Sequence, residues 1–172
     1  MCITTRIQNE AFNIAHKSTQ RYKHGAVITH GSKIMFTGFN QSNRTKILNS
    51  VHTCVHSEID VINKLIKHLK RKHGKHYLKY AKKYSLYVVR LIKLHKNAKK
   101  YSLANSLPCY YCSKKIKEIG LKNIIYSNED GLLVKTKCNQ LHSTHQSDAQ
   151  KKILWAFYLI KYKYKHKYKY KY

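Results

Sequence analysis

Two short motifs contain the residue types that hold a metal ion. The first spans residues 56–58 (His-Ser-Glu) and the second residues 108–112 (Pro-Cys-Tyr-Tyr-Cys). Zinc favours thiolate and imidazole ligands, and a catalytic zinc ion keeps three protein ligands and one open position. Cys109 and Cys112 are spaced so that both sulfur atoms can face one ion from the start of a helix, whose dipole favours their negative charge. With His56 as the third ligand, the sequence predicts a zinc site.

Glu58 is the candidate proton carrier beside this site. It follows His56 by two residues, about 200° around an ideal helix, so it need not compete for the metal. A carboxylate in that position can hold a water molecule and move protons. The signal is specific, because the only proline of the chain directly precedes its only Cys-x-x-Cys motif. A lone His-x-Glu among 12 histidines would be weak evidence.

The elements that must position these motifs can be read from hydrophobic periodicity and turn residues. Ile7, Ala11, Ile14 and Ala15 form one helical stripe, and Gly120 is placed to end a later helix. In chain order we expect a helix of about four turns that includes residues 7–15, then hairpin strands at 25–30 and 33–39 and a helix from 56 to 69. A strand at 85–92, a helix at 109–119, strands at 123–126 and 132–134, and a last helix at 153–160 follow.

The alternation of strands and helices after residue 33 predicts parallel pairing with helical crossovers. The opening hairpin makes the sheet mixed, with five strands in all. Three connecting stretches are polar: residues 40–50 are expected to be a loop, residues 67–83 a solvated helix end and loop, and residues 93–105 a basic connection. We expect one domain over 1–160, with 67–83 and 93–105 as basic insertions.

The chain is very basic, with 35 Lys and Arg against 7 Asp and Glu and a formal net charge of +28. Such a charge attracts nucleic acid and other polyanions. However, 30 of the 35 are Lys, and 15 residues are Tyr, a bias that an AT-rich genome produces without selection. Residues 161–172 alternate Lys with Tyr or His, and we expect a disordered tail that binds nucleic acid weakly and without sequence preference.

Nothing in the sequence suggests a membrane or a secreted protein. The longest apolar run, residues 153–160, is far shorter than the roughly 20 residues that a bilayer span needs. The N-terminus shows no secretory signal. Five cysteines, an odd number, suit metal binding or catalysis in a reducing compartment better than a set of disulfides. We therefore expect a cytoplasmic protein, and the sequence leaves open whether it forms a homo-oligomer.

The two motifs and their surroundings resemble the zinc-dependent cytidine and deoxycytidylate deaminase superfamily. The resemblance covers about residues 7–134 and includes 24–28 (His-Gly-Ala-Val-Ile), 38–40 (Gly-Phe-Asn), 56–62, 106–112 and 120–127. It implies a three-layer α-β-α sandwich and a zinc-activated water that attacks the amidine carbon of a base and expels ammonia.

The resemblance also implies roles for single residues. Glu58 would carry protons from the water to the ring nitrogen and the leaving amine. The backbone around Pro108 would lie near the reacting oxygen, and Asn40 would contact the sugar or the base. Two positions depart from the family pattern, since Ser57 replaces its usual alanine and Leu107 its frequent glutamate. These departures bear on the substrate more than on the chemistry.

Several interpretations stay open at this point. The leading one is hydrolytic deamination of a small cytosine nucleotide or nucleoside, dCMP to dUMP in the simplest case. The chain could instead deaminate a base in tRNA or single-stranded nucleic acid, or serve as a non-catalytic deaminase-like protein that binds nucleic acid. A second, structural zinc site could be built from Cys138, His142 and His145, with His52 and Cys54, although accidental clusters are expected among so many histidines.

Overall fold

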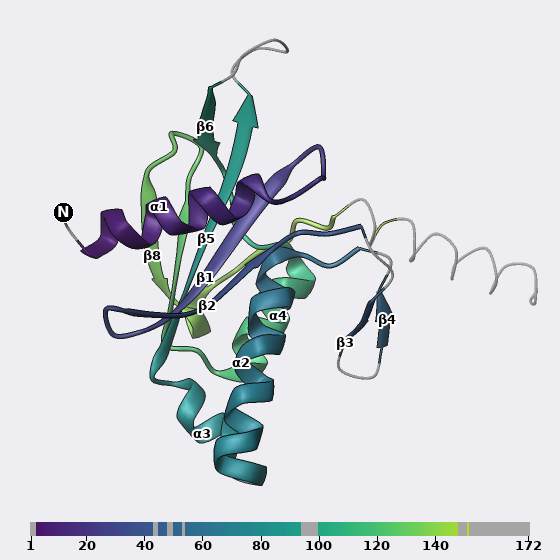
Figure 1. The fold of residues 1–172 in the computed structure, drawn as a ribbon, viewed down its shortest axis with the longest axis vertical. Helices are drawn as coiled ribbons and strands as arrows, with labels where there is room; N and C mark the ends of the chain where they lie inside the picture. Colours follow the sequence, from purple (N-terminus) through teal and green to yellow (C-terminus); the bar gives the residue numbers. More distant parts are fainter. Residues whose placement is uncertain are drawn as a thin grey trace, which may run out of the picture.

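The computed structural model describes residues 3–42, 45–47, 50–52, 54–93, 100–147 and 151 (Figure 1). Within these ranges the centre is a six-stranded sheet in the order β2-β1-β5-β7-β8, with β6 paired to β5 as well. Its strands are β1 (Lys23–His30), β2 (Lys33–Phe39), β5 (Tyr84–Lys93), β6 (Tyr101–Ala104), β7 (Asn123–Ser127) and β8 (Leu133–Lys137). The helices are α1 (Ile3–His16), α2 (Ser57–His73), α3 (Tyr77–Ala81) and α4 (Tyr110–Ile119), with 3-10 turns η1 (Gly74–His76) and η2 (Cys138–Gln140).

Helices cover both faces of the sheet, which gives three layers. Successive strand residues point to opposite faces, and β1 shows the consequence. Val27 packs with Ile7 and Ala11 of α1 on one face. Ala26 and Ile28 pack on the other face with apolar residues of α2 and α4. Figure 1 shows the same arrangement, with α1 on one side of the strands and α2 and α4 on the other. The predicted α-β-α sandwich is confirmed.

The sheet is mixed, as expected from the opening hairpin. β5 and β7 are parallel neighbours, so the crossover predicted between them is confirmed. β1 is antiparallel to both β2 and β5. β2 and β5 therefore run in the same direction, but β1 lies between them and they do not pair. α2 thus connects two strands that are next-nearest neighbours, and it packs against β2 and β1.

Three expected connections contain regular structure. The sequence predicts a loop at residues 40–50, but β3 (Thr45–Ile47) pairs with β4 (Ser50–His52) there. The stretch 67–83 is mostly helical, because α2 continues to His73 and α3 follows. β6, within the expected basic connection 93–105, pairs with the end of β5. The predicted helix at 153–160 and the tail 161–172 lie outside the described residues.

Two glycines show how the helices are placed. Gly120 adopts the left-handed conformation (φ 75°) directly after α4, as predicted. Gly38 of β2 lies against the first turns of α2: a Cβ there would stand 2.8 Å from Oδ2 of Asp60 and 2.9 Å from the backbone nitrogen of Val61. This close approach fixes the start of α2 against the sheet. Within the described ranges, every helix is too short or too polar to cross a lipid bilayer.

Candidate active site

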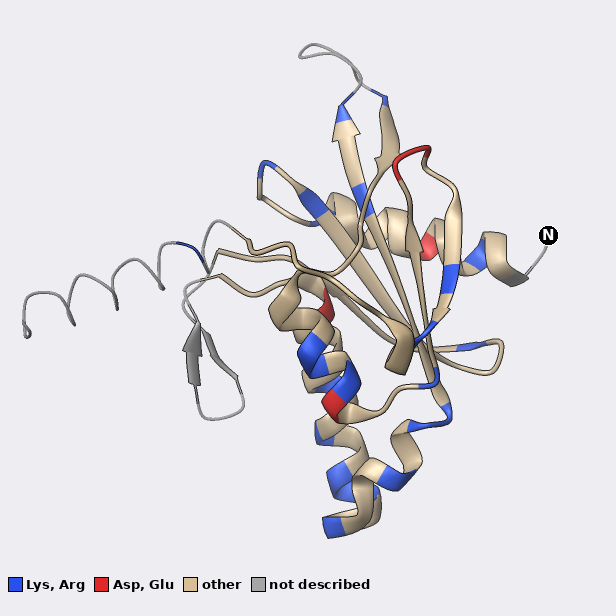
Figure 2. Cartoon of the chain, turned by 180° about the vertical axis from the view of Figure 1, so that it is seen from behind, with Lys and Arg blue, Asp and Glu red and all other residues tan. Residues whose placement is uncertain are grey.

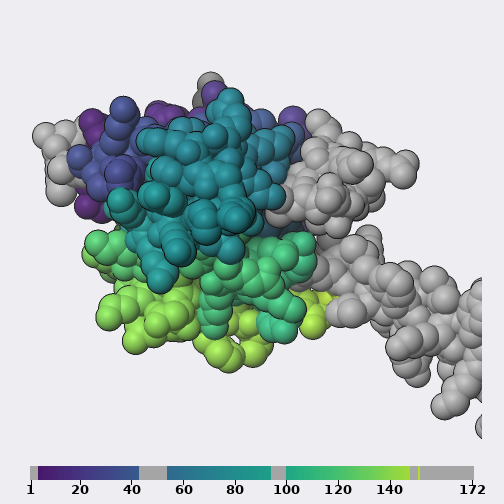
Figure 3. Space-filling model, turned by 90° about the horizontal axis from the view of Figure 1, so that it is seen from below, coloured from purple at the N-terminus to yellow at the C-terminus, as the bar shows by residue number. Residues whose placement is uncertain are grey.

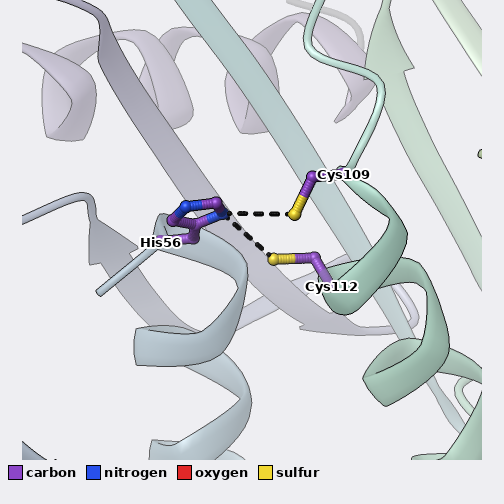
Figure 4. A group of neighbouring side chains, drawn as sticks. All are labelled: His56, Cys109 and Cys112. Atoms are coloured by element: carbon purple, nitrogen blue, oxygen red, sulfur yellow. Dashed lines mark hydrogen bonds between the residues drawn. The ribbon is translucent and has the colours of Figure 1, made fainter. Parts of the chain in front are cut away.

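The two predicted motifs meet at the starts of two helices. His56 is the residue before α2 and Cys109 the residue before α4, and both have extended backbones (φ −73°, ψ 150° and φ −64°, ψ 166°). Cys112 follows in the first turn of α4. Both helices therefore direct their N-termini, which carry partial positive charge, toward the same point. Figure 4 shows the three side chains converging from the two helices.

The three donor atoms have the separations that a tetrahedral ion requires. Nδ1 of His56 lies 3.5 Å from Sγ of Cys109 and 3.3 Å from Sγ of Cys112. Zinc bonds of about 2.0 Å to nitrogen and 2.3 Å to sulfur at the tetrahedral angle place those atoms about 3.5 Å apart. Cys109 and Cys112 are buried, and all three donors lie within 4.8 Å of one another. The donor set therefore fits zinc, and zinc is the metal of this site.

The three side chains are hydrogen-bonded to one another, and these bonds shift their pKa values. The Cys112 thiol donates to Cys109 and, despite the opposing effect of burial, this bond and His56 lower the pKa of Cys109 to about 4. Burial disfavours a charged His56, but its hydrogen bond with Cys109 and the charge of Glu58 raise its pKa to about 9. Burial and the Cys109 hydrogen bond raise the pKa of the Cys112 thiol. One thiolate is thus already favoured at neutral pH.

Glu58 lies buried in the first turn of α2, and it lines the same cavity as His56 and Cys109. The hydroxyl of the fully buried Ser57 donates a hydrogen bond of 3.0 Å to Oε2 of Glu58. The carboxylate is near enough to Cys112 and His56 for its charge to raise the pKa of both. This arrangement places an acid/base group beside the three donors.

Short polar contacts hold the two motifs in place. The backbones of Gln41 and Val55 exchange two hydrogen bonds of 2.9 Å, which bring His56 back beside the end of β2. Ahead of the second motif, the Ser106 hydroxyl donates to the Val88 carbonyl (2.8 Å), and the Ser106 backbone nitrogen donates to the Ser127 carbonyl (2.8 Å). The loop that presents Cys109 is thereby fixed to β5 and β7.

These side chains open into a cavity of about 620 Å³. Arg21, His24 and Arg90 are among the charged or titratable side chains that line it. His24 and Arg90 are register partners on β1 and β5, so they share one face of the sheet. The Arg90 guanidinium lies 4.7 Å from the centre of the Tyr22 ring, and its Nε is buried with no hydrogen-bond partner among the described groups. Burial lowers the pKa of His24, against the opposing charge of Glu58.

Asn40 and Pro108 occupy different places. Asn40 lines the cavity, but its side chain already ties down the chain before β1, since Nδ2 donates to the Tyr22 carbonyl and Oδ1 accepts from the His24 backbone nitrogen, each over 2.7 Å. One N–H and one lone pair of the amide stay available. Pro108 is buried and is not among the residues that line the cavity, and its carbonyl accepts a hydrogen bond from the Ser113 hydroxyl (3.2 Å).

Sequence reasoning did not place His24, Arg90 or the segment 141–147 at this cavity, although it named His145 as a candidate ligand of a second zinc site. This segment passes over the start of α4, where the Tyr110 nitrogen donates to the His145 carbonyl (2.7 Å), and His145 and Ser147 line the cavity. No local motif marks these residues, because only the fold brings them together. Register pairing between the two strands would have been the one available signal for His24 and Arg90.

The second zinc site is not formed by the side chains that the structure describes. Among those side chains, His56, Cys109 and Cys112 are the only group of three such donors within 4.8 Å. Cys138 packs in the apolar core instead. Cys54 and His145 line the main cavity. The side chain of His52 lies outside the described residues.

Comparison with known proteins gives the following findings. The family model described as the cytidine and deoxycytidylate deaminase zinc-binding region matches residues 3–128. A cytidine deaminase from Burkholderia pseudomallei superposes with a TM-score of 0.53 and 18% identity, over 85% of this chain and 100% of that chain. The dCMP deaminase from cyanophage S-TIM5, in complex with dCMP and dUMP, gives a TM-score of 0.48 and 19% identity, over 84% and 95%. Curated proteins yield no match.

Proposed function

Because the chain belongs to the family of the cytidine and deoxycytidylate deaminase zinc-binding region, we propose that it is a hydrolytic deaminase of a cytosine nucleotide, with dCMP as substrate. The reaction consumes one water, breaks the bond between C4 of the ring and its amino nitrogen, and yields dUMP and ammonia. The observation that carries this proposal is that one cavity is lined by His56 and Cys109 of the donor set, by the buried Glu58 carboxylate and by Arg21, His24 and Arg90. The third donor, Cys112, is buried beside the other two.

The ligand set and the acid/base group support separate roles, metal binding for the first and proton transfer for the second. His56, Cys109 and Cys112 would hold the zinc ion, which when bound lowers the pKa of water to near neutrality and so supplies a nucleophile. Glu58 takes one proton from the attacking water and passes it to the ring nitrogen. It then carries the second proton of that water to the amino group, which leaves as ammonia. Its buried position excludes competing water, and the Ser57 hydroxyl holds one of its oxygen atoms.

The cationic wall of the cavity favours a nucleotide over a nucleoside. Arg21 and Arg90 supply two positive charges for a doubly charged phosphate, and an arginine fork suits phosphate oxygens. His24, whose pKa is lowered by burial, can add a hydrogen bond from its neutral ring. The buried Nε of Arg90 has no described partner, so a phosphate oxygen would supply a missing hydrogen bond. Asn40, with its remaining amide hydrogen and lone pair, would bind a sugar hydroxyl. A neutral nucleoside would leave this charge unpaired.

Ammonia release by the zinc-loaded protein tests the proposal. The substrates are dCMP, CMP, deoxycytidine and a cytosine-containing oligonucleotide. We expect dCMP to be turned over most efficiently and Glu58→Gln to lower kcat by about 10²–10⁴. Arg90→Gln should raise KM for dCMP by about 10- to 100-fold, the worth of a hydrogen bond to a charged group, and leave KM for deoxycytidine little changed.

Arg71→Gln is the matched control, because Arg71 is exposed in the last turn of α2 and does not line the cavity. It should leave the kinetics for dCMP unchanged. Preference for deoxycytidine over dCMP would overturn the choice of a nucleotide. Turnover of the oligonucleotide alone would favour deamination within nucleic acid instead.

A further inference from the structure

The lower end of the molecule carries a dense group of positive charges (Figure 2). We define the α2–α3 basic surface as the exposed Lys and Arg side chains within residues 67–83 of α2, η1, α3 and the turn that follows. They are Lys67, Lys70, Arg71, Lys72, Lys75, Lys79, Lys82 and Lys83. The chain has no Asp or Glu between Asp60 and Glu118, so no acidic residue of this segment neutralises them. Figure 3 shows the teal part of the chain, which contains this segment, as a continuous part of the face seen from below.

Aromatic rings bring these cations together. The ring of His73 stacks on Tyr80, with centroids 3.4 Å apart and planes at 7°. Lys70 Nζ lies 5.1 Å from the centre of the Tyr77 ring, and Lys83 Nζ lies 5.7 Å from that of Tyr80. Desolvation and the nearby charges of Lys72, His68 and Lys83 lower the pKa of His73. The side chains thus surround one region of strong positive potential.

The helix dipole does not account for this cluster. Cations in the last turn of a helix compensate its negative end, which covers Lys70, Arg71 and Lys72. The effect is confined to that turn, and Lys75, Lys79, Lys82 and Lys83 lie beyond it. A general excess of lysine in the chain explains their number but not their place together at one end of the molecule (Figure 2).

We propose that the α2–α3 basic surface binds the phosphate backbone of nucleic acid, without sequence specificity. The Cβ atoms of helical residues three or four apart lie about 5–6 Å from each other, which is close to the spacing of successive phosphates along a strand. Among the large apolar side chains of residues 67–83, Leu78 is the one that is clearly exposed (42%). A single such residue gives little apolar area for insertion into a membrane. Charge without an apolar face favours nucleic acid over a lipid surface.

This surface is remote from the cavity. α2 begins beside His56 and ends at His73, and its 17 residues span about 25 Å. Phosphates bound at the far end of α2 therefore lie about 25 Å from the start of the helix, where Glu58 lies. Binding there would hold the protein on nucleic acid while the cavity acts on free substrate, and it does not depend on the proposed deaminase activity.

The test compares two variants of the full chain with the same net charge. In the first, Lys72, Lys75, Lys79 and Lys82 of the surface become glutamine. In the matched control, four exposed lysines elsewhere become glutamine: Lys17, Lys33, Lys135 and Lys137. Binding to a labelled 20-nucleotide single strand is measured by fluorescence anisotropy between about 50 and 200 mM salt.

We expect the surface variant to bind at least about 10-fold more weakly, with a slope of log K against log salt shallower by about 0.7 for each phosphate that the variant no longer neutralises. The control variant should bind less than about 2-fold more weakly than the wild type, and dCMP turnover should be the same in all three proteins. Equal weakening in the two variants would mean that net charge alone is responsible and would overturn the proposal. The proposal would also be overturned if the surface variant bound phosphatidylserine vesicles more weakly than the wild type but bound nucleic acid as tightly.

Discussion

The hydroxyl of Ser57 donates a hydrogen bond of 3.0 Å to Oε2 of Glu58, the residue directly after it in the sequence. Adjacent side chains on a helix ordinarily point apart, but both residues lie in the first turn of α2, and both are buried. The bond restrains the carboxylate beside the three metal donors. Alanine, the usual residue of the family at this position, could not make this contact.

We predict that Ser57→Ala lowers kcat for dCMP by about 3- to 10-fold and leaves KM unchanged. One hydrogen bond is worth about 0.5–1.5 kcal/mol, which sets this range. Ser57→Thr keeps the hydroxyl and should recover part of the lost rate. Steady-state kinetics of the two variants check the prediction, with metal analysis to show that zinc is retained. A change in KM alone would contradict a positioning role.

Cys112→Ala should abolish stoichiometric zinc binding. The fully buried sulfur lies 3.3 Å from Nδ1 of His56 and is one of three donors, and a site with two donors binds zinc far more weakly. Metal analysis after dialysis should find about one zinc per chain in the wild type and less than a tenth of that in the variant. The melting temperature should also fall, because bound metal stabilises the folded state.

Cys54→Ala is the matched control for this experiment. Cys54 lines the same cavity but does not belong to the donor group. It should keep its full zinc content. Loss of zinc in this control, with retention in Cys112→Ala, would show that the ligand set is wrong.

The chemistry of the site could be predicted from sequence because it resides in two compact motifs. Pro108, Cys109 and Cys112 sit where a hydrophobic helix pattern begins, and Gly120 marks its end, so local signals were sufficient to place α4. The family resemblance drawn from these motifs is confirmed by the match over residues 3–128. The roles of Glu58 and Asn40 stay predictions.

The parts that could not be predicted depend on contacts between distant segments. β6 has four residues, none fully buried, within a basic stretch, so no periodic pattern marks it; pairing with the end of β5 makes it a strand. His24 and Arg90 face the cavity because β1 and β5 pair in a particular register. The stretch 67–83, expected to be a solvated helix end and loop, is mostly helical. Leu69 and Ala81 are buried in the core, while the lysines between them face outward.

Gly38→Ala should destabilise the fold by about 1–3 kcal/mol, the usual cost of overpacking. The added methyl group would stand 2.9 Å from the Val61 backbone nitrogen and 3.1 Å from the Ser57 carbonyl oxygen. Neither backbone group can move without displacing the start of α2. Urea denaturation of the zinc-loaded protein measures the loss.

A second substitution shows whether backbone contact is the cause. Asp60→Ala removes the side-chain oxygen that would stand 2.8 Å from the new methyl group. If backbone packing dominates, Gly38→Ala measured in an Asp60→Ala background should cost nearly as much as in the wild type. Full recovery of stability would mean that the Asp60 side chain alone limits this position.

Burial raises the pKa of the Cys138 thiol from 9.0 to about 12, and this shift predicts a pH dependence of stability. The side chain is 2% exposed and packs in the core that includes Ile119 and Leu141. A raised folded-state pKa means that the fold favours the neutral thiol. The contribution of the Cys138 thiol to the free energy of unfolding is therefore complete below about pH 9 and is lost as the pH rises toward 12.

The wild type should lose more stability between pH 9 and 11 than Cys138→Ala. The tyrosines and lysines do not affect this comparison, because they titrate alike in both proteins. Parallel urea titrations of the two proteins at each pH make the comparison, and identical slopes would show that the thiol is not held neutral by the core.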